Sequence, residues 1–296
     1  MHFILKVIEA LRTIRHHPAT RGSGLVAMGN YCVSQLAARY APGDLAVPFV
    51  NGTLLLLSPR MKGAAHYILP GLCEFRSMSF AAHLLRQGDV LADVGANVGA
   101  YALLGATAGA EVISLEPSPD TFRYLERNVR LNGLSHRVSP LNVAAGQEEG
   151  VLPFTEGLGM ENHLCPIGPG ATTVPVTVTT LDQALQGRAP TLLKVDVEGF
   201  EAQVLAGAKE TLAAPTLLAL IIERLGFGRR YGQSEEALHE RIRAFSFLPC
   251  HYRPEDRHLG RSTADAKGNV LYVRDFDVVQ KRLREGARYE FRGLWF

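Results

Sequence analysis

The stretch from Val90 to Gly99, which reads VLADVGANVG, constrains the fold of this chain more than any other part of the sequence. A short apolar run ends at Asp93, then Gly95 and Gly99 bracket a tight turn, and small residues that favour a helix follow. A strand, a glycine turn and a helix in this order begin a nucleotide-binding α/β unit. Because glycine has no Cβ, backbone N–H groups at the helix start can approach a ligand closely. We therefore expect a cofactor at this turn.

The residues of the turn discriminate between two classes of cofactor. A dinucleotide site favours G-x-G-x-x-G, and the corresponding positions here are Gly95, Asn97 and Ala100. The side chain of Asn97 lies where a pyrophosphate would bind, and the carboxylate of Asp93 repels a dianion. Both features suit a ligand that carries an ammonium group and no phosphate, as S-adenosylmethionine does. The turn favours S-adenosylmethionine, with a nicotinamide-dependent oxidoreductase as the alternative.

A second predicted strand, residues 111–116, ends in Glu116, which lies 21 positions after Gly95. That spacing suits a carboxylate that accepts hydrogen bonds from both ribose hydroxyls, in either class of cofactor. Strands and helices then alternate, which predicts a doubly wound α/β sheet. The predicted strands are 90–94, 111–116, 138–143, 192–197, 217–223 and 269–274, the helices are 98–108, 120–132, 201–212 and 235–244, and 150–155 with 172–179 form an antiparallel excursion.

Three acidic residues follow the ends of two predicted strands. Asp196 and Glu198 lie two positions apart after the fourth strand, so both point to one face, and Glu223 closes the fifth. Lys194 lies on the same face and can pair with these acids or hold an anionic acceptor. Burial of acidic side chains at the end of an apolar strand costs free energy, which indicates that these acids have a function. We therefore expect Asp196 to act as a general base. For Glu198, capping of the next helix stays open.

The segments DVGANVG at 93–99, LEP at 115–117 and LKVDVEGFE at 193–201 occur together in this chain. Together they resemble the FkbM-type family of S-adenosylmethionine-dependent methyltransferases, over roughly residues 67–274. The resemblance implies O-methyl transfer to a hydroxyl of a sugar, a glycan or a glycosylated natural product. It also implies a Rossmann-like class I methyltransferase fold, with a seven-stranded, mostly parallel sheet whose last strand is antiparallel and helices on both faces.

Similar proteins often carry a histidine two positions after the glutamate of the fifth strand, where this chain has Leu225. This departure leaves Asp196, Glu198 and Glu223 as candidate bases and raises the alternative of a divalent metal held by these three acids. Carboxylates alone do not distinguish Mg²⁺ from a bare general base.

Family members also carry a tyrosine and a glutamate before the glycine motif, and Tyr67 and Glu74 are the nearest matches. Glu74 either faces the cofactor or is a solvated carboxylate at a helix start. Asn142, at the end of the third strand, either bonds the adenine amino group or bonds its own backbone as a turn residue. The expected cofactor contacts are Glu74, Asp93, Gly95, Ala96, Asn97, Gly99, Glu116, Pro117, Asn142, Ala144 and Asp196, and the expected catalytic residues are Asp196, Glu198, Lys194 and Glu223.

Two outer segments flank the predicted cofactor domain. Apolar residues repeat at helical spacing in 4–11 and 25–40, and Asn51-Gly52 between two apolar runs predicts a β-hairpin with a type I′ turn. The helices pack on the domain or pair two copies of the chain, which leaves a homo-oligomer open. The last segment either touches an anionic membrane surface or docks as an amphipathic helix. The expected division is a helical and hairpin cap at 1–66, a methyltransferase domain at 67–275 and a basic amphipathic tail at 276–296.

Composition excludes several other classes of protein. A hydrophobic content of 47% with 20% charged residues is typical of a globular protein, and a net charge of +2 gives no reason to expect nucleic acid binding. The four cysteines are scattered without a C-x-x-C pair, which disfavours a zinc site and fits a cytoplasmic protein. No signal peptide or membrane span is expected. A cofactor-binding module without catalytic activity is disfavoured, because the chain retains four expected functional acids together. These acids are Asp93, Glu116, Asp196 and Glu198.

Overall fold

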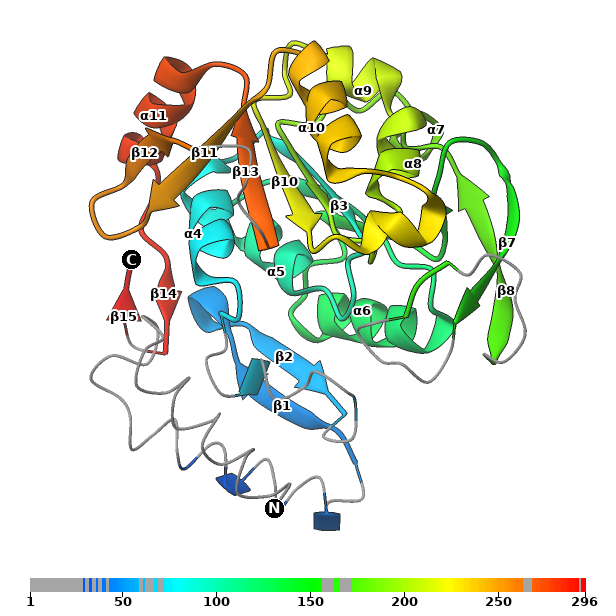
Figure 1. Ribbon diagram of the computed structural model, residues 1–296. Helices are drawn as coiled ribbons and strands as arrows, with labels where there is room; N and C mark the ends of the chain where they lie inside the picture. Colours follow the sequence, from blue (N-terminus) through cyan, green and yellow to red (C-terminus); the bar gives the residue numbers. More distant parts are fainter. Residues whose placement is uncertain are drawn as a thin grey trace, which may run out of the picture.

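The computed structural model describes residues 43–58, 61, 67–68, 72–155, 162–164, 172–262, 268–292 and 294–296, together with positions 29, 32, 33, 36, 39 and 40. The helices predicted for 4–11 and 25–40 therefore lie almost wholly outside the described residues. A mixed eight-stranded sheet forms the centre of the molecule, with helices on both faces (Figure 1). Its strands, in spatial order, are β12 (His258–Arg261), β11 (Leu248–Arg253), β13 (Gly268–Val273), β10 (Ala219–Arg224), β9 (Leu192–Val195), β3 (Val90–Val94), β4 (Glu111–Leu115) and β5 (Val138–Leu141).

The predicted Rossmann-like architecture is confirmed. Strands β10, β9, β3, β4 and β5 run parallel, and β13 pairs antiparallel with β10. The edge strand β12 pairs with β11 and adds an eighth strand to the seven that were expected. The predicted excursion is also confirmed, because β7 (Gly150–Thr155) pairs antiparallel with β8 (Thr173–Thr179) in a small separate sheet with β6 (Ala144–Ala145).

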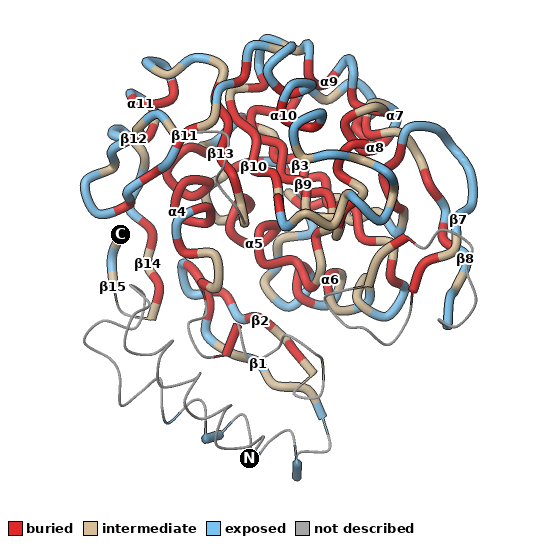
Figure 2. Tube along the Cα trace, in the orientation of Figure 1, coloured by how far each residue is buried: buried red, intermediate tan, exposed pale blue. Residues whose placement is uncertain are grey.

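Two helical layers cover the sheet. The first contains α4 (Phe75–Leu84), α5 (Ala100–Thr107), α6 (Pro119–Leu131) and α11 (Phe276–Glu285), and the second contains α7 (Leu181–Leu185), α8 (Glu201–Ala206), α9 (Lys209–Ala213) and α10 (Glu235–Ala244). Between the layers the strands are buried almost throughout (Figure 2).

The helix predicted for 201–212 is divided into α8 and α9 at Gly207. A Cβ on this glycine would lie 2.0 Å from the carbonyl oxygen of Gly146. A distant segment of the chain therefore passes too close for a side chain at this position. The prediction of one helix was wrong because local periodicity carries no information about this tertiary contact.

Successive residues of the central strands face opposite layers, as a pleated strand requires. On β9, Leu192 packs with the α4 layer and Leu193 with the α7 layer. The same parity places Lys194 and, one step past the strand, Asp196 on the α4 face. Polar residues thus follow apolar ones on a single face of the sheet, at the carboxyl ends of the strands.

The predicted hairpin is formed by β1 (Leu45–Pro48) and β2 (Leu54–Leu57). Asn51 and Gly52 have φ angles of 50° and 75°, and the N–H of Thr53 donates to the carbonyl oxygen of Val50 over 3.0 Å, which is a type I′ turn. Side chains of the hairpin share the apolar core of α4 and α5. The hairpin therefore packs against the helical layer that contains α4 and α5.

The tail docks on the domain, which is the second of its two predicted interpretations. Helix α11 lies against α4 and buries Val279 and Leu283, and Arg282 pairs with Asp89. The chain ends in a short hairpin of β14 (Glu290–Phe291) and β15 (Leu294–Trp295). Within the described residues, no helix is both long enough and apolar enough to cross a membrane.

The β1–β2 hairpin is attached to α6 by two asparagines, and this attachment gives a test of stability. Fully buried Asn128 accepts from the N–H of Leu56 over 2.6 Å and donates to the carbonyl oxygens of Leu56 and Val98, whereas the less buried Asn132 bonds both backbone groups of Leu54. We expect Asn128→Ala to lower the free energy of unfolding by about 3 kcal/mol, because buried backbone groups lose their partners.

The matched variant Asn132→Ala should lower it by about 1 kcal/mol, since water can replace its bonds. Urea unfolding measures both variants. Equal losses would show that burial of these contacts is not what attaches the hairpin.

Candidate active site

A cavity of about 400 Å³ lies at the carboxyl ends of β3, β4, β9 and β10. Parallel α/β sheets generally bind ligands at this edge. Most of the residues that sequence reasoning selected line it, on all sides of the same space. These residues are Tyr67, Glu74, Gly95, Ala96, Asn97, Glu116, Pro117, Ala144, Lys194, Asp196, Glu198 and Glu223.

Three of the expected cofactor contacts lie outside the lining of the cavity. The amide of Asn142 donates to the carbonyl oxygens of Glu116 and Pro117 over 2.8 and 3.1 Å, so it fixes the turn after β4. Gly99 packs on α6, where a Cβ would lie 2.6 Å from Leu125 Cδ1. Asp93 is fully buried behind the turn. Asn142 and Gly99 therefore shape the site through the backbone and through packing.

The backbone N–H groups of the glycine turn are all used inside the protein. These five N–H groups therefore do not face a ligand. The expectation of backbone contacts at the helix start stays a prediction for the N–H groups of α5 itself, which begins at Ala100. Gly95 and Ala96 donate to the carbonyl oxygen of Leu115, Asn97 donates to Glu116 Oε2, Val98 donates to Asn97 Oδ1, and Gly99 donates to the carbonyl oxygen of Ala96.

Gly95 is needed for close packing between two strands. Its φ is +79°, and a Cβ built on it would lie 1.8 Å from the backbone oxygen of Asp196. The turn after β3 thus contacts the end of β9 directly. This contact brings the two sequence motifs together, with Glu116 on one side of the cavity and Asp196 on the other.

Glu116 is held as the sequence predicts, at the end of β4 and facing the cavity. It is 6% exposed, and its two oxygens accept from the N–H groups of Asn97 and Ser118, each over 2.9 Å. Burial raises the pKa of this carboxyl to about 7, although both backbone bonds favour the ionised form.

A buried lysine organises the acids on the α4 face. Lys194 is 3% exposed, and its Nζ lies 3.0 Å from Asp196 Oδ2 and 4.8 Å from the centre of the Tyr101 ring. The Tyr101 hydroxyl in turn donates to Glu74 Oε2 over 2.6 Å. Burial alone lowers the pKa of Lys194, but the carboxylates of Asp196, Asp93 and Glu74 more than reverse this, so its pKa lies above the ordinary value. Lys194 is therefore a permanent cation.

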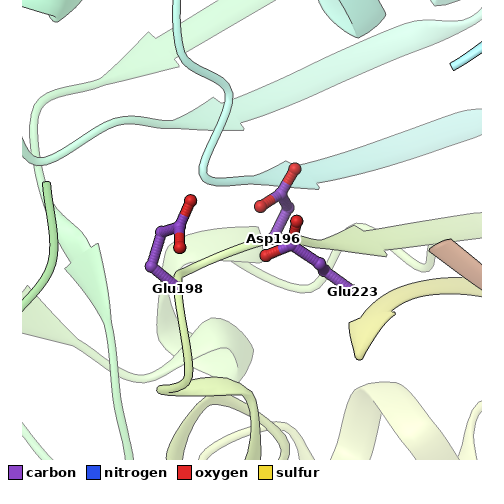
Figure 3. Close-up of side chains that lie close together, drawn as sticks. All are labelled: Asp196, Glu198 and Glu223. Carbon is purple, nitrogen blue, oxygen red and sulfur yellow. The ribbon is translucent and has the colours of Figure 1, made fainter. Parts of the chain in front are cut away.

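The convergence of Asp196, Glu198 and Glu223 is confirmed. One carboxylate oxygen from each lies within 4.8 Å of the others, and Figure 3 shows the three side chains entering the same space. Burial and repulsion from Asp196 and Glu198 raise the pKa of Glu223 to about 10. Three carboxylate oxygens at this separation suit a proton or a hard divalent cation.

Glu201 is a residue of the site that sequence reasoning missed. It is 5% exposed, and its Oε1 accepts from the N–H groups of Val197 and Gly199 over 3.3 and 3.0 Å. These bonds hold a bend in which Glu198 and Gly199 have φ angles of 57° and 108°. Glu201 therefore fixes the bend before α8, whose N-cap position is Phe200 and has no side-chain cap bond. The sequence offered one signal for this role: Glu201 is an acid in the first turn of a helix, two positions after Gly199.

The far wall of the cavity was also missed. It is apolar and comes from Phe154 on β7, Leu164 and Phe200. The Phe200 ring meets Tyr231 edge-on at 5.1 Å, and the Tyr231 hydroxyl donates to the carbonyl oxygen of Leu164. The antiparallel excursion therefore contributes an apolar part of the cavity wall. Sequence periodicity predicted these strands but gave no indication of the cavity they face.

Asp93 completes the negative character of the site. It is fully buried, and neither carboxylate oxygen has a hydrogen-bond partner among the described residues. Burial raises its pKa to about 6. Buried carboxylates without partners are rare in proteins. With Glu74, Asp196, Glu198 and Glu223 nearby, the arrangement favours a cationic ligand.

Residues 93–254, more than half of the chain, match the methyltransferase FkbM domain. The chain belongs to this family. This membership favours a methyltransferase over the nicotinamide-dependent alternative.

Individual relatives match over shorter stretches. The hexuronic acid methyltransferase AglP of Haloferax volcanii is 33% identical over 129 residues, which cover 43% of this chain and 52% of that protein. The methyltransferase sdnD of Sordaria araneosa is 28% identical over 162 residues, which cover 43% of this chain and 62% of that protein. This chain thus spans less than two thirds of either relative.

The crystal structure of the methyltransferase FkbM from Methylobacillus flagellatus matches 71% of this chain and 52% of its own, with 20% identity and a TM-score of 0.45.

The contact between Gly95 and Asp196 gives a second test. We expect Gly95→Ala to lower the free energy of unfolding by more than about 3 kcal/mol, because the new Cβ must displace the end of β9. Gly133 is the matched control, since its φ is +67° but nothing lies within 4 Å of an added Cβ. Gly133→Ala should cost only the left-handed strain, about 1–2 kcal/mol. Denaturant unfolding compares them, and similar losses would mean that strain alone makes Gly95 necessary.

Proposed function

We propose that this protein is an S-adenosylmethionine-dependent O-methyltransferase that methylates a hydroxyl of a sugar, a glycan or a glycosylated natural product. Family membership supports methyl transfer. The observation that carries the choice of an alcohol acceptor is the convergence of Asp196, Glu198 and Glu223 in the cavity, since an alcohol requires a base or a metal. The name of the relative from Haloferax volcanii supports a carbohydrate substrate.

The residues of the cavity fit S-adenosylmethionine, which carries a sulfonium, an ammonium and no phosphate. Glu116 would bind the ribose hydroxyls, and the acids around Lys194, including Glu74 and Asp93, would favour the positive groups. The turn offers no free N–H to a phosphate. When bound, this cofactor supplies a methyl group activated by the sulfonium.

Asp196 is the proposed general base. Lys194 Nζ holds one of its oxygens at 3.0 Å, which fixes the orientation of the carboxylate. Asp196 would accept the proton of the acceptor hydroxyl as its oxygen is methylated. The residues of the cavity would contribute most of the rate enhancement by positioning the acceptor. Phe154 and Phe200 exclude water from the opposite side.

A divalent cation is the alternative way to activate the acceptor. Asp196, Glu198 and Glu223 would hold it, and oxygen ligands of this kind suit Mg²⁺. A metal would lower the pKa of a coordinated hydroxyl and so replace the base.

The overall proposal is tested by incubating the purified protein with S-adenosylmethionine and a panel of sugars and glycosides. Mass spectrometry should find a product that has gained one CH₂ relative to its acceptor. A metabolite extract serves as a second source of acceptors. Binding of S-adenosylmethionine without any methylated product in either source would contradict the catalytic assignment.

Asp196→Asn should lower turnover by roughly 10²–10⁴-fold, because the acceptor alcohol keeps its proton. Single-turnover rates with the acceptor so found measure this, and calorimetry confirms that the variant still binds cofactor. If a metal activates the acceptor instead, EDTA should cause a comparable loss in the wild type that added Mg²⁺ reverses. Wild-type rates in Asp196→Asn would exclude this residue as the base.

Cofactor affinity should depend on pH through Glu116. Its pKa of about 7 lies above the ordinary value, so the carboxyl is mostly neutral at pH 6 and mostly ionised at pH 8. Ribose hydroxyls bind the ionised form more strongly, so affinity for S-adenosylmethionine should rise roughly tenfold over this range. Calorimetry at several pH values measures it. Glu116→Gln should bind weakly and lose this component, and an unchanged profile in that variant would contradict the assignment.

A further inference from the structure

The C-terminal hairpin, residues 289–292 and 294–296, lies against one wall of the cavity. Its two strands are closed by reciprocal backbone bonds between Tyr289 and Phe296, over 3.0 and 3.1 Å. The N–H of Glu290 donates to Asn51 Oδ1 over 2.9 Å, which ties the hairpin to the turn between β1 and β2. In Figure 1 the hairpin lies beside α4, far in sequence from the motifs of the sheet.

Arg292 connects this hairpin to a residue of the cavity. Its Nη2 donates to the carbonyl oxygens of Tyr67 and Ile68 over 3.4 and 2.9 Å. Tyr67 is 7% exposed and lines the cavity. Guanidinium bonds to carbonyl oxygens are charge-assisted and stronger than neutral ones. Arg292, which lies outside the central sheet, therefore helps to fix the position of Tyr67.

Phe296 contacts the other end of the same wall. Its ring meets Phe75 edge-on at 5.1 Å and stacks on Tyr289 at 5.3 Å. Phe75 is the first residue of α4 and follows Glu74 directly, and the Tyr289 hydroxyl lies 2.6 Å from Ser79 Oγ on the same helix. The hairpin thus contacts the chain on both sides of the segment that carries Tyr67 and Glu74.

All of these contacts lie outside residues 93–254, the part that matches the family. The matched part supplies the glycine turn, Glu116 and the three acids. The opposite wall, with Tyr67 and Glu74, is added by the chain before it and supported by the chain after it. This wall reaches the catalytic acids, because Glu74 bonds Tyr101, whose ring lies under Lys194.

We propose that the C-terminal hairpin is a positioning element of the cofactor site, and that Arg292 holds Tyr67 and the adjoining wall in the form that binds the cofactor. This rests on the proposed function, in that S-adenosylmethionine is the ligand of the cavity. Arg292 does not line the cavity, so it acts through Tyr67 and is not a catalytic residue.

The test compares Arg292→Ala with Arg288→Ala, an exposed arginine next to the hairpin. Calorimetry gives the affinity for S-adenosylmethionine, and hydrogen exchange with mass spectrometry follows the amides of residues 67–84. Arg292→Ala should weaken binding roughly tenfold and speed exchange in this segment, since two bonds to a charged donor are lost. Arg292→Lys keeps the charge and should restore part of both, whereas Arg288→Ala should behave as the wild type.

Equal affinity and exchange in Arg292→Ala and Arg288→Ala would overturn the inference. If the wild type binds no S-adenosylmethionine, the proposed function fails, and exchange at 67–84 still decides whether the hairpin supports the wall. Should Arg292→Ala not fold, Phe296→Ala takes its place, because it removes the contact with Phe75 and leaves the arginine intact. Wild-type exchange and affinity in Phe296→Ala would then overturn the inference.

Discussion

The buried ammonium group of Lys194 is the interaction on which the acid-rich site depends. It bonds Asp196 and lies over Tyr101, and among the described residues that line the cavity it is the one basic side chain. Without it, Asp93, Glu74 and Asp196 would have no counter-charge, and the neutral forms of Asp93 and Glu74, whose pKa values burial already raises, would be favoured further. The lysine orients the Asp196 carboxylate, and the acids still leave the site with an excess of negative charge. That excess distinguishes this site from one that binds phosphate.

The glycine turn shows how one local geometry serves different chemistry. In a dinucleotide site, glycines let the backbone contact a pyrophosphate. Here the N–H groups from Gly95 to Gly99 donate to β4, to Glu116 and to acceptors within the turn itself. The backbone of Asp196 lies where a side chain at Gly95 would be. The glycine is thus required for packing between strands.

Sequence reasoning predicted what depends on local periodicity. Strand 90–94 and helix 235–244 have the predicted bounds, because their apolar patterns and the Ser234 cap are local. The meeting of Asp196 with Glu223 also followed from the sequence, since the carboxyl ends of parallel strands share one edge. The catalytic roles of these acids stay predictions.

What escaped prediction depends on contacts between distant parts of the chain. The backbone of Gly146 excludes a side chain at Gly207, where the helix is divided, and Glu201 supports a bend that only the folded loop reveals. The edge strand β12 has a weak apolar pattern, because it is buried on one side only. The aromatic wall comes from an excursion whose orientation the sequence does not specify.

The contact between Asn51 and Glu290 joins the two ends of the described structure. The packed layers on the two faces of the central sheet have cores of their own, to which this contact does not belong. The wall with Tyr67 and Glu74 has its outer contacts only while Arg292 and Phe296 are docked. Local opening of the hairpin would therefore loosen this wall while the layers of the sheet stay intact.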